Sequence, residues 1–346
     1  MDITELLQFS AKEDASDVHI SSGEPPIMRI HGEMRMVEMP ALSAEDVHKF
    51  LYEILSDQQR KVFEETHEID FSIDLKDIAR FRVNAFVQNR GESIVFRNIP
   101  TKIPTFEELR LPPIIAEITR KPKGLVLVTG PTGSGKSTTL AAMVDLINNE
   151  RKEHILTIED PIEFVHTTKN CLISQRELGP HTHSFSNALR AALREDPDVI
   201  LVGEMRDLET ISLAITAAET GHLVMGTLHT SSAAKTIDRV IDVFPPEQQS
   251  QIRAMFSESI NAVIAQILLK KKGGGRVAAH EIMIGTPAVR NLIREGKTAQ
   301  IGSSIQTGKN YGMQSMDSAL AALYKDDIVE KEEIMKHISN PNMLEE

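Results

Sequence analysis

A glycine-rich segment at residues 130–138 carries the clearest chemical signal in the sequence. It fits the pattern G-x-x-x-x-G-K-[ST], with an apolar stretch at 125–129 before it and helix-forming residues at 140–143 after it. Glycines let backbone N–H groups curl around a phosphate, and the following helix N-terminus adds positive potential. This context disfavours a purely structural glycine turn. We predict nucleotide contacts from Gly130, Thr132, Gly133, Ser134, Gly135, Lys136, Ser137 and Thr138.

Two side chains of this loop indicate that its ligands are ATP and Mg²⁺. In P-loop enzymes the lysine reaches the β- and γ-phosphates, and the hydroxyl of the next residue binds Mg²⁺. We therefore expect Lys136 to contact the phosphates and Ser137 to ligate the metal.

Carboxylates follow two of the predicted strands. Glu159, Asp160 and Glu163 come after the strand at 155–158, and Glu204 comes after the strand at 199–202. Ligands of open parallel sheets bind at the carboxyl ends of the strands. We expect Glu163 to orient the attacking water and Glu204 to support Mg²⁺ through a metal-bound water. The alternative for each acid is a solvated loop charge.

The acid at position 204 belongs to an atypical Walker B motif. An ordinary Walker B strand ends in an aspartate, whereas here Gly203 precedes Glu204. A longer carboxylate in this place favours contact with the metal through water rather than directly.

Two histidines bracket the strand predicted at 223–227. If the strand is straight, His222 and His229 lie about 20 Å apart and cannot share one site. His229 is at the carboxyl end, where it can sense the γ-phosphate. His222 is at the other end, where it is either a turn residue or a contact between subunits.

Arginines are the expected source of positive charge for the transferring phosphoryl group. Three arginines lie on predicted strands of the N-terminal region, and one supplied by a neighbouring subunit could stabilise this charge: Arg80, Arg82 and Arg97. The alternative for exposed strand arginines is simple solvation. Candidates within the phosphate-binding region itself are Arg190, Arg194 and Arg206.

The elements that must position these residues form an α/β pattern. Near-continuous apolar strands at 125–129, 155–158, 199–202 and 223–227 alternate with helices, as a parallel sheet covered on both faces requires. Four prolines between residues 100 and 113 predict a linker at 101–118. After the glycines at 273–275 we expect a mostly helical region that completes a domain at 119–346.

The first hundred residues predict a small mixed α/β domain. A short amphipathic helix at 3–9 precedes strands at 18–20 and 27–30, and a capping-box start at Ser43 predicts one helix to about residue 63. Alternating patterns then predict the remaining strands at 69–73, 81–85 and 94–99.

Composition excludes several classes of function. A net charge of −12 argues against a direct nucleic-acid binder, and a single cysteine, Cys171, excludes a disulfide framework or a tetracysteine zinc site. We expect Cys171 to be a small buried residue. The N-terminus lacks a signal peptide, and apolar runs are too short to span a bilayer. A cytoplasmic protein that meets a membrane only through a partner is therefore expected.

The motifs together resemble the secretion-ATPase family of hexameric P-loop motors. The match is carried, in order, by GPTGSGKST (130–138), TIEDPIE (157–163), DVILVGEMRD (198–207) and TGHLVMGTLHT (220–230). In the N-terminal region SDVHISSGEPPIMRIHG (16–32) and FRVNAF (81–86) match as well. Late in the chain, AVRNLIRE (288–295) is similar to a motif associated with retraction ATPases.

The resemblance implies a PAS-like domain at 1–100, a RecA-like domain at 119–346 and a ring of six subunits. ATP would lie between the two domains, with Arg82 and Arg97 reaching it. Extension and secretion ATPases of the family usually carry a further N-terminal domain and often a tetracysteine site, so a chain with neither is expected in the retraction branch. Its implied work is pilus retraction through a PilC-like platform protein, at the inner face of the inner membrane.

Three alternatives stay open at this point. The chain could belong to another branch of the family, as a type IV secretion or accessory retraction ATPase. It could be a small-molecule kinase, although a kinase normally has an arginine-bearing lid and needs no hundred-residue domain in front. It could also be a nucleotide-binding switch with negligible turnover, which steady-state phosphate release would distinguish.

Overall fold

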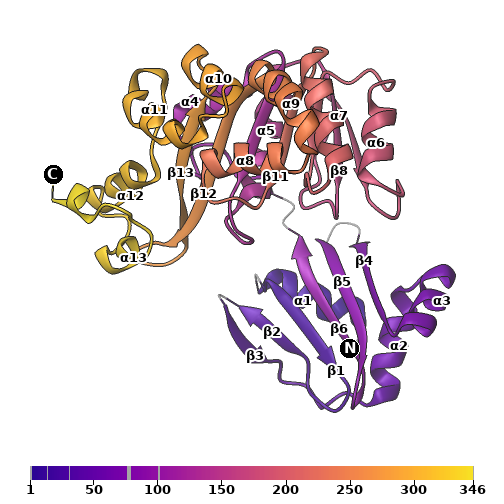
Figure 1. Ribbon diagram of the computed structural model, residues 1–346. Helices are drawn as coiled ribbons and strands as arrows, with labels where there is room; N and C mark the ends of the chain where they lie inside the picture. The colour runs from indigo at the N-terminus through magenta and orange to yellow at the C-terminus, as the bar shows by residue number, and fades with distance from the viewer. Residues whose placement is uncertain (1, 14, 31, 76–78, 100–101, 346) are drawn as a thin grey trace. The chain divides into compact units, whose positions relative to one another are not determined.

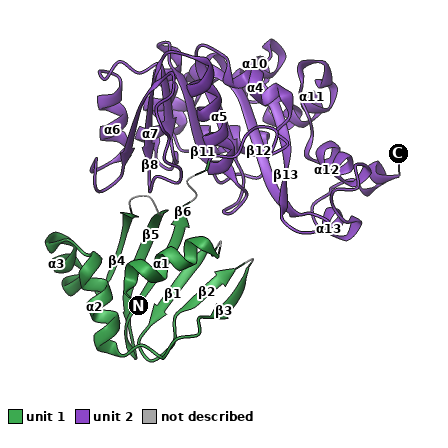
Figure 2. Ribbon diagram, turned by 180° about the vertical axis from the view of Figure 1, so that it is seen from behind, with its two compact units in different colours: residues 1–102 green, residues 103–346 purple. Residues whose placement is uncertain are grey.

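The chain folds into two compact units, residues 1–102 and 103–346 (Figures 1 and 2). The computed structural model describes residues 2–13, 15–30, 32–75, 79–99 and 102–345. The predicted domain boundary at residues 100 and 101 lies outside this part of the chain.

The first unit contains a six-stranded sheet in the order β3-β2-β1-β6-β5-β4, and all neighbouring strands are antiparallel. The strands predicted in this region are confirmed, and β3 is an addition. The elements are α1 (Ile3–Lys12), β1 (Asp17–Ser21), β2 (Ile27–Ile30), β3 (Glu33–Met36), α2 (Ala44–Ile54), α3 (Asp57–Thr66), β4 (Glu68–Leu75), β5 (Ala79–Gln88) and β6 (Gly91–Ile99).

One face of this sheet carries the core of the unit. Along β5 every second residue from Ala79 to Ala85 is buried, as the alternating sequence predicts. Phe81 and Phe96 meet edge to face on neighbouring strands, with ring centroids 6.3 Å apart. The opposite positions of β5 carry Arg82 and its polar neighbours.

The single helix expected from Ser43 to about residue 63 is wrong, because the chain forms two helices there. Leu55 has an extended backbone and ends α2. Ser56 then accepts a hydrogen bond from the backbone N–H of Gln59, and the Gln59 side chain accepts from the Ser56 N–H. This second capping box, S-x-x-Q, starts α3 and explains the break.

The second unit contains a seven-stranded sheet in the order β13-β12-β7-β11-β10-β8-β9. All its neighbours are parallel except β12 and β13. The four predicted strands are confirmed as β7, β8, β10 and β11. The strands are β7 (Gly124–Thr129), β8 (His154–Glu159), β9 (Leu172–Glu177), β10 (Val199–Val202), β11 (Leu223–Leu228), β12 (Ile260–Lys270) and β13 (Arg276–Ile284).

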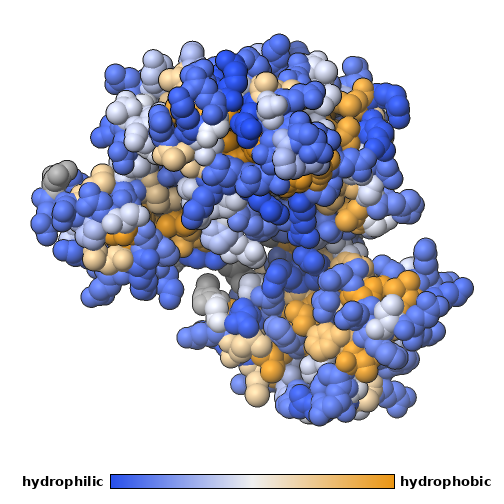
Figure 3. Space-filling model, in the orientation of Figure 1, coloured by the Kyte–Doolittle hydropathy of each residue, from blue (hydrophilic) through white to orange (hydrophobic). Residues whose placement is uncertain are grey.

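Helices cover both faces of this sheet, which explains why its central strands are apolar throughout. Alternate residues of β7 point to opposite cores, Leu125 and Leu127 to one and Val126 and Val128 to the other. On the visible face of this unit hydrophilic side chains predominate (Figure 3). The helices are α4 (Pro113–Thr119), α5 (Lys136–Glu150), α6 (Phe185–Ala192), α7 (Leu208–Glu219), α8 (Ala233–Asp242), α9 (Pro246–Ser259), α10 (Pro287–Arg294), α11 (Ile301–Thr307), α12 (Met316–Lys325) and α13 (Lys331–Met335), with 3₁₀ turns η1 (Thr298–Gln300), η2 (Lys309–Tyr311) and η3 (Pro341–Leu344).

Two segments differ from the expectation. The glycines at 273–275 lead into a strand, β13, before the helical region begins; all three have positive φ and turn the chain from β12 into its antiparallel partner. Residues 103–118, expected in a linker, belong to the second unit. Leu111, Ile115 and Ile118 are buried in its core, so this segment is held by packing.

His280 on β13 predicts a pH-dependent stability. Its side chain is 2% exposed, its Nε2 has no hydrogen-bond partner among the described residues, and burial lowers its pKa to about 4. Between pH 6.5 and 4 the unfolded chain therefore binds a proton that the folded chain does not. Stability from this residue is full above pH 6.5 and falls by up to about 3 kcal/mol toward pH 4.

We expect His280→Gln to flatten this loss of stability on acidification. The measurement is the denaturant midpoint at several pH values between 7 and 4. His183→Gln, which removes an exposed histidine of the same unit, is the matched control. An unchanged pH slope in His280→Gln would contradict the assignment.

Candidate nucleotide-binding site

The loop between β7 and α5 has a backbone with positive φ at three positions, a conformation that favours glycine. Gly130, Gly133 and Gly135 have φ values of 146°, 79° and 87°. A Cβ at Gly130 would lie 2.6 Å from Ser134 Oγ and would also clash with the carbonyl oxygen of Gln266. Because α5 begins at Gly135 without a side-chain cap in the described structure, its first N–H groups face the loop. The loop therefore presents a cradle of donors suited to a phosphate.

Lys136 is held inside this loop. Its Nζ donates to the carbonyl oxygens of Gly130 at 2.9 Å and Pro131 at 3.2 Å. Burial lowers the pKa of this ammonium group, and the charge of Glu204 acts in the opposite direction. A partly desolvated ammonium held by two carbonyls can turn to a phosphate, which is a stronger partner.

The order of the strands brings His229 and Glu204 to Lys136. β11 lies between β7 and β10, and all three are parallel, so their carboxyl ends meet at one edge. His229 Nδ1 is 3.4 Å from Lys136 Nζ, and His229 Nε2 is 3.1 Å from Glu204 Oε1. The imidazole therefore links Lys136 to the acid after β10.

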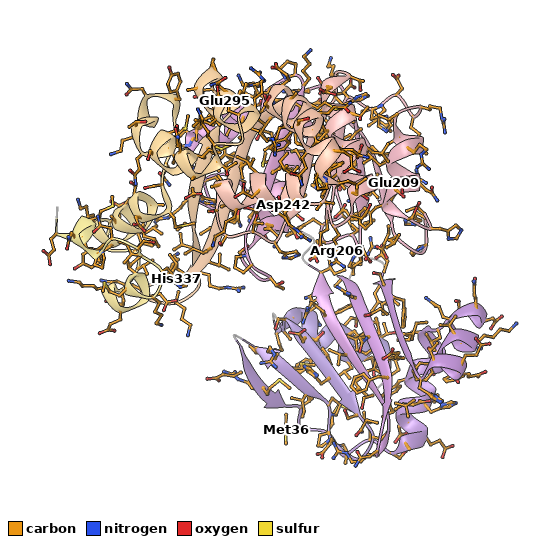
Figure 4. All side chains as sticks on the ribbon, viewed as in Figure 1. Met36, Arg206, Glu209, Asp242, Glu295 and His337 are labelled. Atoms are coloured by element: carbon orange, nitrogen blue, oxygen red, sulfur yellow. The ribbon has the colours of Figure 1, made fainter. Side chains whose placement is uncertain are left out.

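Glu204 is also held by Arg206, which is labelled in Figure 4. The guanidinium contacts both carboxylate oxygens, with Nε at 2.5 Å from Oε1 and Nη2 at 2.6 Å from Oε2. Partial burial alone would raise the pKa of Glu204, but the Arg206 hydrogen bond and charge, with His229, lower it. Glu204 is thus an ionised acceptor suited to a metal-bound water.

The acids after β8 occupy two different environments. Glu163 is exposed, and its backbone N–H donates to Glu159 Oε2 at 3.3 Å. Glu159 also accepts from Thr157 Oγ1 at 2.7 Å and Gln175 Nε2 at 3.2 Å. Burial raises the pKa of Glu159 despite these hydrogen bonds. Glu159 therefore fixes the loop from which the Glu163 side chain projects.

The arginines of the first unit lie on one face of its sheet. Arg82 on β5 and Arg97 on β6 are directly opposite each other in the register. Arg97 Nε pairs with Asp17 at 2.9 Å, and Arg82 Nε lies 3.8 Å from Asp70. Like charges placed directly opposite cost stability. The carboxylates of Asp17 and Asp70 offset this repulsion. Contact of the two arginines with the nucleotide stays a prediction.

The remaining candidates have local partners or positions. Arg190 pairs with Glu209, and Arg194 is exposed at the end of α6. The Nδ1 of His222 is 2.9 Å from the carbonyl oxygen of Ala217, in the turn before β11. Cys171 is buried and free, as expected. Thr132, Gly133 and Ser137 are exposed at the loop, and Thr138 is half-buried.

The site fits a nucleotide and its magnesium ion. Ser134 Oγ is buried and has no hydrogen-bond partner among the described residues, directly beside the donor cradle. The described residues hold no cluster of three or more His, Cys, Asp or Glu side chains for a metal. Mg²⁺ does not need one, because it is usually held by one or two protein groups together with the substrate phosphates and water. Ser137 and Glu204 can supply these groups.

Gln266 was missed by the sequence reasoning. It is 1% exposed on β12, where its amide contacts the phosphate loop. The sequence does indicate a special role for this residue, because a glutamine stands inside the apolar run 263–269, where a purely structural strand would have an apolar residue.

The helix α10 contains the two arginines of the late motif. Arg290 donates to three backbone carbonyls, those of Gly285 at 2.8 Å, Ile260 at 2.9 Å and Glu258. Arg294 pairs with the exposed side chain of Glu258. The first arginine thus joins α10 to the end of α9 and the start of β12, whereas the second stays at the surface.

Several known proteins resemble this chain along most of its length. It is 62% identical over 332 residues to the type IV pilus retraction ATPase PilT of Pseudomonas aeruginosa, covering 96% of each chain. It is 57% identical to a twitching motility protein of Neisseria gonorrhoeae, covering 92% of this chain and 86% of that one. The crystal structure of the pilus retraction motor PilT with bound ADP matches with a TM-score of 0.93 and 46% identity, covering 100% and 99% of the two chains.

The parallel sheet, the phosphate loop after β7 and the acid and histidine after neighbouring strands define a P-loop ATPase fold. Residues 1–274 match the family described as type II/IV secretion system protein, and the chain belongs to this family. Among the described residues, no helix combines the length and apolarity needed to cross a membrane.

Proposed function

We propose that this protein is an ATP-hydrolysing motor subunit that powers retraction of type IV pili. The observation that carries the proposal is the link from Lys136 through His229 to Glu204 at the phosphate loop, in a chain 62% identical to a pilus retraction ATPase. The subunits form a ring of six in the cytoplasm. The ring acts at the inner face of the inner membrane on a platform protein of the pilus.

The chain's own residues divide the work at the nucleotide. The loop N–H groups and Lys136 bind the phosphates, and Ser137 and Glu204 hold Mg²⁺, Glu204 through water. When bound, Mg²⁺ neutralises charge that develops on the β- and γ-phosphates. Glu163 orients the attacking water, and His229 reports the state of the γ-phosphate to Glu204. Arg82 and Arg97 stabilise the equatorial oxygens of the transferring group.

Deletion of the gene in its host tests the function. A retraction motor predicts abundant surface pili together with loss of surface motility. Loss of pili would instead assign the chain to extension, and unchanged pili and motility would favour another secretion system. That branch has support of its own, since the chain is 37% identical over 282 residues to the type II secretion system protein E of Aeromonas hydrophila, covering 78% of this chain and 54% of that one.

The roles of the two acids predict different defects. Glu163→Gln removes the group that orients water, so bound ATP should persist while turnover falls about a hundredfold. Glu204→Gln weakens support of the metal, so activity should require a higher Mg²⁺ concentration. Phosphate release across a Mg²⁺ titration, with retained nucleotide measured in parallel, separates the two. The opposite pattern would exchange the assignments.

The two arginines of α10 predict separable effects on stability and on coupling. Arg290→Ala leaves three carbonyls without their donor and should cost about 2 kcal/mol of unfolding free energy. Arg294→Ala removes an exposed ion pair and should change stability by less than about 0.5 kcal/mol.

We expect Arg294→Ala to keep ATPase activity but to lose retraction in cells. Equal loss of both activities would contradict a coupling role.

A further inference from the structure

We propose that Gln266 is a positioning residue that fixes the phosphate loop from the side opposite to His229. The sheet order places β7 between β11 and β12, so the loop after β7 has one neighbour on each side. The β11 side supplies His229. On the other side Ala265 pairs with Thr129, and Gln266 lies next to the first loop residue, Gly130.

The amide of Gln266 makes two hydrogen bonds that tie the end of the loop and the first turn of α5 to β12. Its Nε2 donates to the carbonyl oxygen of Ser134 at 2.6 Å, and its Oε1 accepts from Thr139 Oγ1 at 2.9 Å on α5. A backbone carbonyl can only accept, so the amide nitrogen must face Ser134. The side chain is 1% exposed, and no surface role competes with these contacts.

The hydrogen bond to Ser134 fixes the direction of a phosphate-binding group. The peptide that joins Ser134 to Gly135 is planar and trans, so its C=O and N–H point in opposite directions. With the carbonyl held toward β12 by Gln266, the Gly135 N–H is held away from β12, toward the concave side of the loop. Gly135 itself has a positive φ of 87°, a conformation that needs support to persist before a ligand binds.

The contact therefore preorganises the loop. Without the amide, the Ser134–Gly135 peptide can rotate, and nucleotide binding must then order it again. Loss of preorganisation weakens nucleotide in the ground state and the transition state alike, which raises KM and leaves kcat nearly unchanged. The inference rests on nucleotide binding by this loop, as proposed above.

The test compares Gln266→Met with Gln314→Met in the full-length protein. Methionine keeps the length of the side chain and removes both hydrogen bonds of Gln266. Gln314 donates its amide to the backbone carbonyl of His280 on β13 at 2.9 Å, and within the described part of the chain its side chain has no hydrogen bond to the loop, so it is a matched control. The probes are a fluorescent ADP for affinity, ATP turnover for KM and kcat, and thermal unfolding without nucleotide.

For Gln266→Met we expect the Kd of ADP and the KM of ATP to rise about five- to tenfold, with kcat within about twofold of wild type. Gln314→Met should keep both constants within about twofold. A Gln266→Met protein that unfolds at a lower temperature but binds ADP as wild type would overturn the proposal. If the wild-type protein itself does not bind ADP, that result contradicts the proposed nucleotide site rather than the role of Gln266.

A second variant covers the case in which Gln266→Met does not fold. Thr139→Val keeps the shape of the α5 side chain and removes the hydrogen bond that orients the Gln266 amide. A loss of ADP affinity of more than about twofold supports the proposal, and an affinity within that range overturns it.

Discussion

Substitution of Lys136 by alanine should abolish ATP hydrolysis while the fold persists. The ammonium group donates to the carbonyls of Gly130 and Pro131 and packs little apolar surface. Its loss therefore removes the positive charge that faces the phosphates rather than core contacts. Donors preorganised toward a reacting phosphate are worth about a hundredfold or more in rate. Steady-state phosphate release is the measurement, with unfolding temperature as the check on the fold.

The exposed Lys152 supplies the matched control, because Lys152→Ala removes an equal charge from the same unit, directly after α5. We expect this control to keep full activity. A Lys136→Ala protein with more than a tenth of wild-type turnover would contradict the assignment of the loop as catalytic. Loss of activity together with loss of the folded state would leave only a structural role.

The second large effect concerns Arg82 and Arg97. These two cations stand directly opposite each other on β5 and β6, each beside one carboxylate, that of Asp70 for Arg82 and that of Asp17 for Arg97. Arginines aimed at the transferring phosphoryl group are worth about a thousandfold or more in turnover. We therefore expect the Arg82→Ala, Arg97→Ala double variant to be nearly inactive as an ATPase, with each unit still folded.

Mixed rings show whether these arginines act between subunits. The double arginine variant and Glu163→Gln should each be inactive alone. If the arginines of one subunit serve the Glu163 of the next, some interfaces of a mixed ring are complete, and part of the activity returns. Arginines that act within their own subunit complete no site. Covalently linked subunits provide the control for mixing, and no recovery in such rings would refute action between subunits.

Local patterns in the sequence were sufficient for the phosphate loop and for most of the strands. Residues 130–138 are consecutive, so their spacing alone specifies the turn, its glycines and the helix that follows. Apolar runs likewise predicted β7, β8, β10 and β11, because strands covered on both faces have no polar alternation. The break between α2 and α3 is also encoded locally, by the capping box at Ser56, which the prediction of a single helix missed.

Tertiary structure alone decided which side chains meet at the loop. Sequence places His229 and Glu204 after two strands, but only the order β7-β11-β10 makes them neighbours of Lys136. Gln266 lies 132 residues after Ser134, and the pairing of β12 with β7 is what brings its amide to the loop. The role of Arg290 likewise depends on three backbone carbonyls outside α10 that accept its hydrogen bonds. Strand order depends on the packing of the whole sheet, and no local pattern encodes it.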